Sequence, residues 1–143
     1  MRIKSKWLCI LIVLSSTCSA AWKIDPSRTV ISSDPIYQKT KTGGLGQATF
    51  MMMKGSISYM TSSDTTQTTC DKYPDIIDSS PIVVENINLS ATSWCSDGSI
   101  FTSIEGDEAR WLFERLWKQR YVVIDGWNVD TTGFQQAVRQ LPK

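Results

Sequence analysis

An amphipathic helix pattern in the last third of the chain most constrains the fold. Apolar residues recur at helical spacing between Asp107 and Arg120. Acidic residues occupy the first turn of this segment and basic residues the last, as the helix dipole favours. The apolar stripe consists of Ala109, Leu112, Phe113, Leu116 and Trp117. Such a stripe has to be buried against another apolar layer, which the rest of the chain must supply.

Strand patterns precede this helix and one follows it. Alternating or continuous apolar runs, bounded by turn residues, mark each of them. They lie at residues 48–54, 56–59, 82–95, 100–104 and 121–124. The turn sequence 96–99 contains Gly98, which adopts positive φ at low cost. It therefore predicts that the flanking segments form a hairpin.

A second helix is predicted near the C-terminus, and a loop near the middle of the chain. Thr132 and Gln135 fit a capping box, and apolar residues continue at helical spacing to Leu141. Residues 61–69 are all Thr, Ser, Asp or Gln, which predicts a solvated loop. Because strands come first and helices late, the expected fold class is α+β. We expect an antiparallel β-sheet with two C-terminal helices packed on one face.

The N-terminus has the order of a secretory signal peptide. Basic residues precede an apolar stretch from Trp7 to Leu14, and small residues follow. Cleavage is predicted after Ala20, with Ala21 as the alternative. Eight apolar residues are too few for a helix across a bilayer, which needs about 20. Lipidation at Cys18 is a second alternative, although the residues before it depart from the usual attachment pattern.

The sequence thus predicts a signal peptide at residues 1–20 and a single α+β domain at residues 21–143. Two cysteines remain in that domain, Cys70 and Cys95. Two cysteines in an exported chain most simply pair, so one disulfide is predicted. Closing that loop stabilises the fold by about 3 kcal/mol in the chain-entropy model. The expected location is periplasmic or secreted.

Charge and composition exclude several functions. After the three basic residues of the signal are removed, 12 basic residues face 14 acidic ones, so the net charge is −2. A nucleic-acid binder needs a basic face, so none is expected. The chain has no histidine, which excludes Ser-His-Asp and Cys-His catalysis and the common zinc sites. No catalytic motif, metal or organic cofactor is expected, and no second apolar stretch is long enough to span a bilayer.

Carboxylates are the only catalytic set that the composition leaves. They lie at the helix start and around a Trp-Asn turn, at Glu105, Asp107, Glu108, Asp125 and Asp130. Two carboxyl groups at a set separation can hydrolyse glycosidic bonds. The same residues also fit helix-terminus and turn chemistry, which is the simpler interpretation.

The tryptophans point instead to binding. Trp111 falls opposite the apolar stripe of its helix and has charged neighbours, among them Arg115 at i+4. Trp127 lies in the Trp-Asn turn. Trp111 is either an exposed binding residue or covered by another element, such as the N-terminal segment. We expect a non-catalytic binding protein that sequesters or neutralises a protein partner in the cell envelope, with Trp111, Trp127 and Arg115 in its binding site. It would be immunity- or inhibitor-like, or an accessory subunit; the alternative is a small carboxylate-based hydrolase of envelope glycan.

Overall fold

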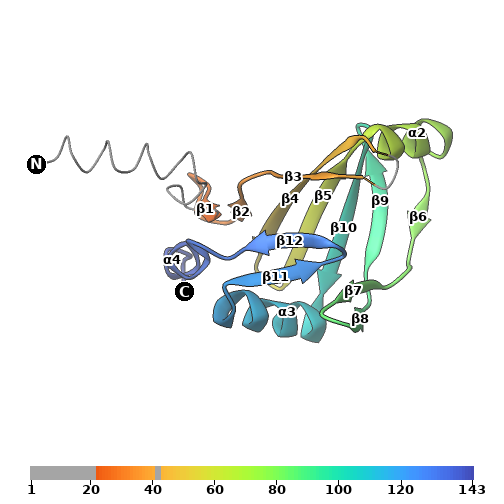
Figure 1. Cartoon of the computed structure of the whole chain (residues 1–143). Helices are drawn as coiled ribbons and strands as arrows, with labels where there is room; N and C mark the ends of the chain where they lie inside the picture. The colour runs from red at the N-terminus through yellow and green to blue at the C-terminus, as the bar shows by residue number, and fades with distance from the viewer. Residues whose placement is uncertain (1–21, 41–42) are drawn as a thin grey trace, which may run out of the picture.

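The computed structural model describes residues 22–40 and 43–143 (Figure 1). The predicted signal peptide, its cleavage site and Cys18 lie outside these residues. The strands of the larger sheet are β1 (Trp22–Ile24), β2 (Ile31–Ser33), β3 (Ile36–Lys39), β4 (Leu45–Met53), β5 (Ser56–Ser62), β6 (Ile77–Asp78), β9 (Thr92–Ser96) and β10 (Ser99–Glu105). The strands of the smaller sheet are β7 (Ile82–Val84), β8 (Ile87–Leu89), β11 (Tyr121–Ile124) and β12 (Trp127–Asp130). The helices are α2 (Asp64–Lys72), α3 (Gly106–Lys118) and α4 (Phe134–Arg139).

Both sheets are antiparallel throughout the described residues. The larger sheet has the order β1-β2-β4-β5-β10-β9-β6, with β3 also paired to β4. The smaller sheet has the order β12-β11-β7-β8. In the long β4-β5-β10-β9 stretch, tight turns join β4 to β5 and β9 to β10. Strands β5 and β10 are distant in the sequence and pair in a register that keeps their buried residues on one face. The α+β class predicted from the sequence is confirmed.

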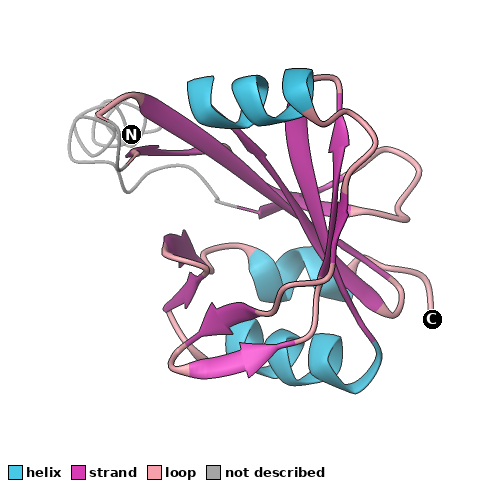
Figure 2. Cartoon of the chain, turned by 90° about the vertical axis from the view of Figure 1, so that its right-hand side faces the viewer, coloured by secondary structure: helices cyan, strands magenta, loops and turns pink. Residues whose placement is uncertain are grey.

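The helices and the smaller sheet cover one face of the larger sheet, here called the inner face (Figures 1 and 2). This face carries the buried side chains of Phe50, Tyr59 and Ile104. The helix α3 packs on β5 and β10 through its apolar stripe, and α4 packs on β1, where Phe134 meets the ring of Trp22 edge-on at 4.9 Å. The opposite side of the larger sheet is called the outer face.

The predicted disulfide is present and fixes α2 to the inner face. Cys70 and Cys95 are bonded, with their Cα atoms 5.6 Å apart. Cys95 pairs across strands with Ile100, whose side chain lies on the inner face. Cys70 is the buried residue of α2. The helix is therefore held on the sheet by a covalent bond rather than by an apolar stripe.

The prediction that residues 61–69 form a solvated loop is wrong, because most of them belong to α2. Ser63 caps the helix by accepting from the Thr66 N–H, and the Thr66 hydroxyl accepts from the Ser63 N–H. This capping box supplies the hydrogen bonds that begin a helix. The sequence signal was hidden because the segment has no apolar periodicity.

The single strand predicted at residues 82–95 is also wrong. Glu85 and Asn86 both have positive φ, at 50° and 67°. Two consecutive residues of this kind form a tight hairpin turn. The segment therefore folds back as β7 and β8 in the smaller sheet and then crosses to the larger sheet as β9. The hairpin predicted around Gly98 is confirmed as the β9–β10 connection.

The two helices predicted near the C-terminus form, with different ends. The first, α3, begins at Gly106 and ends at Lys118. The second, α4, begins after Gly133, which has φ 82° and provides no side-chain cap. The predicted capping box is wrong, because Thr132 donates to Asp130 and Gln135 donates to the Trp117 carbonyl.

The β11–β12 hairpin is anchored to the larger sheet at three points. Its turn residue Asp125 accepts a hydrogen bond from the Tyr59 hydroxyl at 2.9 Å. The side-chain amide of Gln38 in β3 donates to the Gly126 carbonyl and accepts from the Asn128 N–H, at 3.1 and 3.0 Å. An added Cβ on Gly46 would lie 3.3 Å from the Trp127 ring. These contacts close the side of the molecule where the two sheets meet.

Candidate binding surface

A row of apolar side chains crosses the outer face of the larger sheet. The row is formed by cross-strand neighbours: Met60 pairs with Phe101, Phe101 with Trp94, and Trp94 with Ile77. The rings of Trp94 and Phe101 stack, with centroids 6.0 Å apart and an interplanar angle of 12°. These four residues are called the outer row.

Strand alternation places the outer row opposite the core. In β5 and β10 the flanking residues Tyr59 and Thr102 are buried on the inner face. Side chains one position along a strand point the other way. Met60 and Phe101 are therefore held on the outer face by the burial of their own neighbours.

The outer face exposes more apolar surface than the outer row alone. Trp94 is 38% exposed and Ile77 is 71% exposed. Strand pairing places Tyr37, Leu45 and Met53 on the same face, and all three are exposed. None of the helices among the described residues packs on this side (Figure 2). Contiguous apolar surface left uncovered is typical of an interaction site.

The cross-strand neighbours that flank the outer row are polar and uncharged. On the adjoining rungs of the ladder lie Ser58, Ser103 and Thr92, with Ser62, Ser99 and Ser96 on the other side. The charged strand residues on this face are Lys23, Lys39 and Glu105. Lys23 lies on the border strand β1, and Lys39 and Glu105 lie at the ends of their strands. Aromatic and methionine side chains with few charges are the composition that distinguishes the centre of a protein–protein interface.

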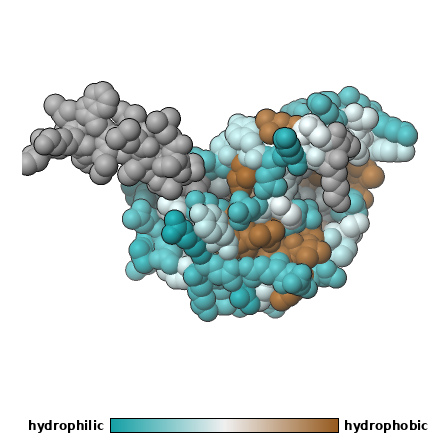
Figure 3. Space-filling view, in the orientation of Figure 1, coloured by the Kyte–Doolittle hydropathy of each residue, from teal (hydrophilic) through white to brown (hydrophobic). Residues whose placement is uncertain are grey.

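A second apolar surface lies on the outward side of the smaller sheet. On the face that Figure 3 shows, apolar residues gather over the β11–β12 hairpin. Val83, Tyr121 and Val123 are each roughly half exposed there. The Arg120 guanidinium lies 5.7 Å from the Tyr121 ring centroid, so this surface is bordered by charge.

Two of the carboxylates singled out in the sequence share a groove beside Trp94. Glu105 and Glu108 line an open groove of about 590 Å³ with Trp94 and several Ser and Thr side chains. The Glu108 carboxylate accepts a hydrogen bond from the Ser90 N–H. The other three carboxylates lie elsewhere. Asp107 pairs with Arg110, Asp125 accepts from Tyr59, and Asp130 accepts from Thr132.

Asp125 lines a cavity of about 250 Å³ on the inner face, with both polar and apolar walls. A hydrogen-bonded series lines its floor, in which Ser93 contacts Thr102 at 2.8 Å and Tyr59 donates to Asp125. Burial, and then the negative charge of Asp125, raise the pKa of Tyr59 above its usual value. The Tyr59 hydroxyl therefore stays protonated and acts as a hydrogen-bond donor to the turn.

Trp111 and Arg115 lie together on α3, away from the outer row. The Arg115 guanidinium stacks 4.8 Å from the Trp111 ring centroid. Trp111 is half-buried and packs against the core. It lies on a helix stripe whose ends contact the β7–β8 hairpin: Glu108 accepts from Ser90, and Gln119 donates to Glu85 at 3.4 Å. Trp111 is thus neither fully exposed nor fully buried.

Trp127 is half-buried on β12 against Gly46 and is not part of the Trp111–Arg115 pair. The sequence pattern indicated Trp111, Arg115 and Trp127 as binding residues and did not indicate the outer row. A signal for part of the row was present. Trp94 and Phe101 lie three residues on either side of the Asp97-Gly98 turn, so a two-residue hairpin pairs them directly.

No family model matches the chain, and no curated protein or solved structure matches it. Within residues 22–40 and 43–143, no helix is both long and apolar enough to cross a membrane. The same residues contain no group of three or more Cys, Asp or Glu side chains placed to hold a metal ion.

Proposed function

We propose that this chain is an exported, non-catalytic binding protein that sequesters or neutralises a protein partner in the cell envelope. It engages that partner through the outer row and the apolar residues around it. The observation that carries the proposal is the uncovered outer face, where stacked aromatic rings and methionines lie among uncharged side chains. An immunity protein, an inhibitor or an accessory subunit fits this description.

The composition of the outer face favours a protein partner over a glycan. Met51, Met53 and Met60 all lie on this side of the sheet. Methionine side chains are flexible and polarisable, and they are frequent where a surface adapts to another protein. Trp94, at the centre of the row and already held by Phe101, has the character of an interface anchor.

The disulfide is consistent with an oxidising compartment outside the cytoplasm. The stacked pair of Trp94 and Phe101, of which Trp94 is exposed, suits capture of a protein partner. Export and a place in the envelope form part of the proposal and rest on the signal-like N-terminus.

One experiment compares two exposed aromatic residues on opposite sheets. Residues 21–143 serve as bait for an envelope extract, in parallel with Trp94→Ser and the control Tyr121→Ser. Tyr121 is 48% exposed, and it lies on the smaller sheet. A partner recovered at one copy per chain by wild type and Tyr121→Ser, but about thirtyfold more weakly by Trp94→Ser, supports the proposal. Equal binding by all three forms, or loss only with Tyr121→Ser, contradicts it.

A second function, hydrolysis of envelope glycan, is favoured by one observation. Glu105 and Glu108 share a groove with an aromatic side chain, Trp94, on which a sugar ring can stack. The purified chain should then release sugars from cell-wall material, and Glu105→Gln should abolish the release while Asp130→Asn leaves it unchanged. Absence of release by the wild type removes this alternative.

A further inference from the structure

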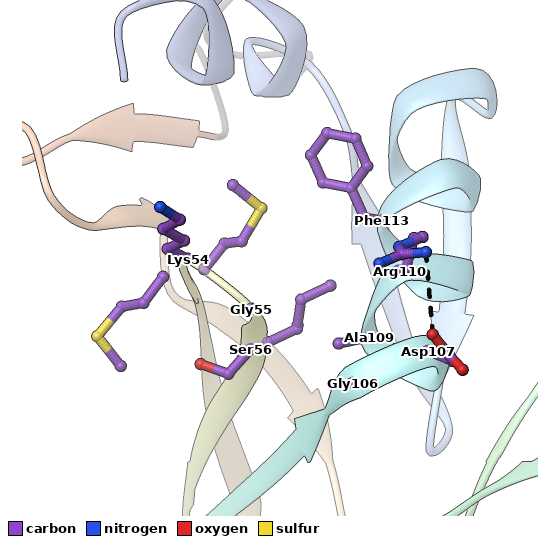
Figure 4. Close-up of a pocket in the computed structure, with 11 residues that line it drawn as sticks. Lys54, Gly55, Ser56, Gly106, Asp107, Ala109, Arg110 and Phe113 are labelled. Carbon is purple, nitrogen blue, oxygen red and sulfur yellow. Dashed lines mark ion pairs between the residues drawn. The ribbon is translucent and has the colours of Figure 1, made fainter. Parts of the chain in front are cut away.

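A cavity opens at the end of the molecule where β4 turns into β5 and β10 passes into α3. Its volume is about 380 Å³, at the small end of the range for small-molecule sites. Figure 4 shows Ala109 and Phe113 pointing from α3 toward the β4–β5 turn that carries Lys54 and Gly55, with Arg110 beside Asp107 on the same helix. One wall comes from the β4–β5 turn and the other from the start of α3. The two segments lie side by side because Ser56 and Glu105, which adjoin them, are cross-strand neighbours.

The interior of this cavity is apolar. Met52, Ile57 and Ala109 line it and are almost fully buried, and the half-buried Phe113 forms the wall toward α4. Phe113 also packs against Phe134, with ring centroids 5.5 Å apart, so the wall is continuous with the core. A hydrocarbon group that enters here removes apolar area from water, which is favourable in proportion to that area.

The rim of the cavity is positively charged. It carries Lys54 and Arg110, opposed by a single carboxylate, Asp107. Arg110 and Asp107 are 3.9 Å apart, and both side chains are largely exposed, so this pair holds the guanidinium weakly. Among the described residues, no carboxylate forms an ion pair with Lys54. Both cations are therefore free to meet an anion at the mouth of an apolar cavity.

We propose that this cavity binds a small anionic amphiphile, a fatty-acid-like molecule with one carboxylate on an apolar tail. The tail lies among Met52, Ile57 and Phe113, and the carboxylate lies between Lys54 and Arg110. The two cations repel an amphiphile with an amine head group. A fully polar anion cannot contact the apolar walls favourably, so those walls stay in contact with water. The site is separate from the outer row, which contains none of these residues.

Methionine methyl groups provide a direct test with octanoate as the probe. In residues 21–143 the methyl signal of the buried Met52 reports on the cavity, while Met60 reports on the outer row. We expect octanoate to shift the Met52 signal saturably and to leave Met60 unchanged. Octanol should bind roughly tenfold more weakly, and octylamine more weakly still, because neither has the carboxylate. Equal binding of octanoate and octanol, or no shift of Met52, overturns the proposal.

The charge of the rim is tested by substitution. The double variant Lys54→Gln/Arg110→Gln should bind octanoate roughly tenfold more weakly, whereas Lys118→Gln, on the same helix outside the cavity, should bind it as the wild type does. All three positions are exposed, so each variant should fold. Unchanged affinity in the double variant overturns the proposal. Loss of partner binding in the Trp94→Ser variant bears only on the outer face, so the two proposals fail separately.

Discussion

The two faces of the larger sheet carry similar side chains with different surroundings. On the inner face Phe50 stacks on Tyr59 at 4.9 Å, and both residues are at most 1% exposed. On the outer face Phe101 stacks on Trp94 at 6.0 Å, and Trp94 is 38% exposed. Strands β4 and β5 provide the inner pair, and β9 and β10 of the same sheet provide the outer pair. The difference is the layer of helices and small sheet above one of them, so apolar residues that stabilise the fold on one side are left to meet a partner on the other.

Replacing Phe50 or Phe101 by alanine tests this difference between the two faces most directly. Phe50→Ala should lower the free energy of unfolding by about 3–5 kcal/mol, because the side chain is fully buried and leaves a cavity. Phe101→Ala should cost only about 1 kcal/mol, since its surroundings are open to water. Urea unfolding of both variants measures the difference. Similar losses would show that the outer face is covered by something in the folded chain.

Removal of the disulfide tests what holds α2 on the inner face. The double variant Cys70→Ser/Cys95→Ser should lose about 3 kcal/mol of stability through the loop of 25 residues. The helix has only one buried residue, so we expect α2 to lose hydrogen-exchange protection before the sheet does. Thermal unfolding and hydrogen exchange measure these effects. Unchanged protection of α2 would mean that its capping box is sufficient.

Trp111→Ala should cost an amount of stability between those of Phe50→Ala and Phe101→Ala. Trp111 is half-buried against the core and stacked with Arg115, so we expect a loss of about 2 kcal/mol. A partner-binding role would appear as an additional loss of affinity in the folded variant, measured by titration at a temperature well below its Tm. A stability change within about 0.5 kcal/mol would instead mark Trp111 as a surface residue.

Tyr59→Phe should have the smallest effect, about 1 kcal/mol, because it removes one hydrogen bond and keeps the stacked ring. The pH dependence gives a sharper readout. Burial and Asp125 raise the pKa of Tyr59 in the folded state, while an unfolded tyrosine ionises near pH 10. Its contribution to stability is complete below about pH 10 and is lost as the pH rises above it. The Phe variant should therefore lose stability less steeply in that range; identical slopes would contradict the raised pKa.

The sequence was informative where apolar spacing was regular. It predicted the α3 stripe from Ala109 to Trp117, the β9–β10 hairpin and the Cys70–Cys95 bond, because each depends on neighbours along the chain or on chemistry with few alternatives. It missed α2, whose helix depends on a Ser63–Thr66 capping box and a distant disulfide rather than on apolar periodicity.

The candidate surface was harder to predict for a related reason. Met60 and Ile77 join the Trp94–Phe101 pair only through the order of strands in the sheet. Alternation shows which residues share a face, but it does not show which face the helices cover. For Trp111 the same limit applies, because spacing along a helix does not show how far the core covers a residue at the border of the apolar stripe.

The bond pattern of Gln38 has a consequence for how the protein behaves at high concentration. A strand at the border of a sheet offers unpaired N–H and C=O groups to any other chain. On β12 the carboxamide of Gln38 occupies two of these groups, the Gly126 carbonyl just before the strand and the Asn128 N–H within it. One side chain thus imitates a rung of a neighbouring strand and blunts the border against edge-to-edge aggregation. A carboxylate at that position could accept a hydrogen bond but not donate one, and a methyl group could do neither. This protection against self-association therefore depends on the amide.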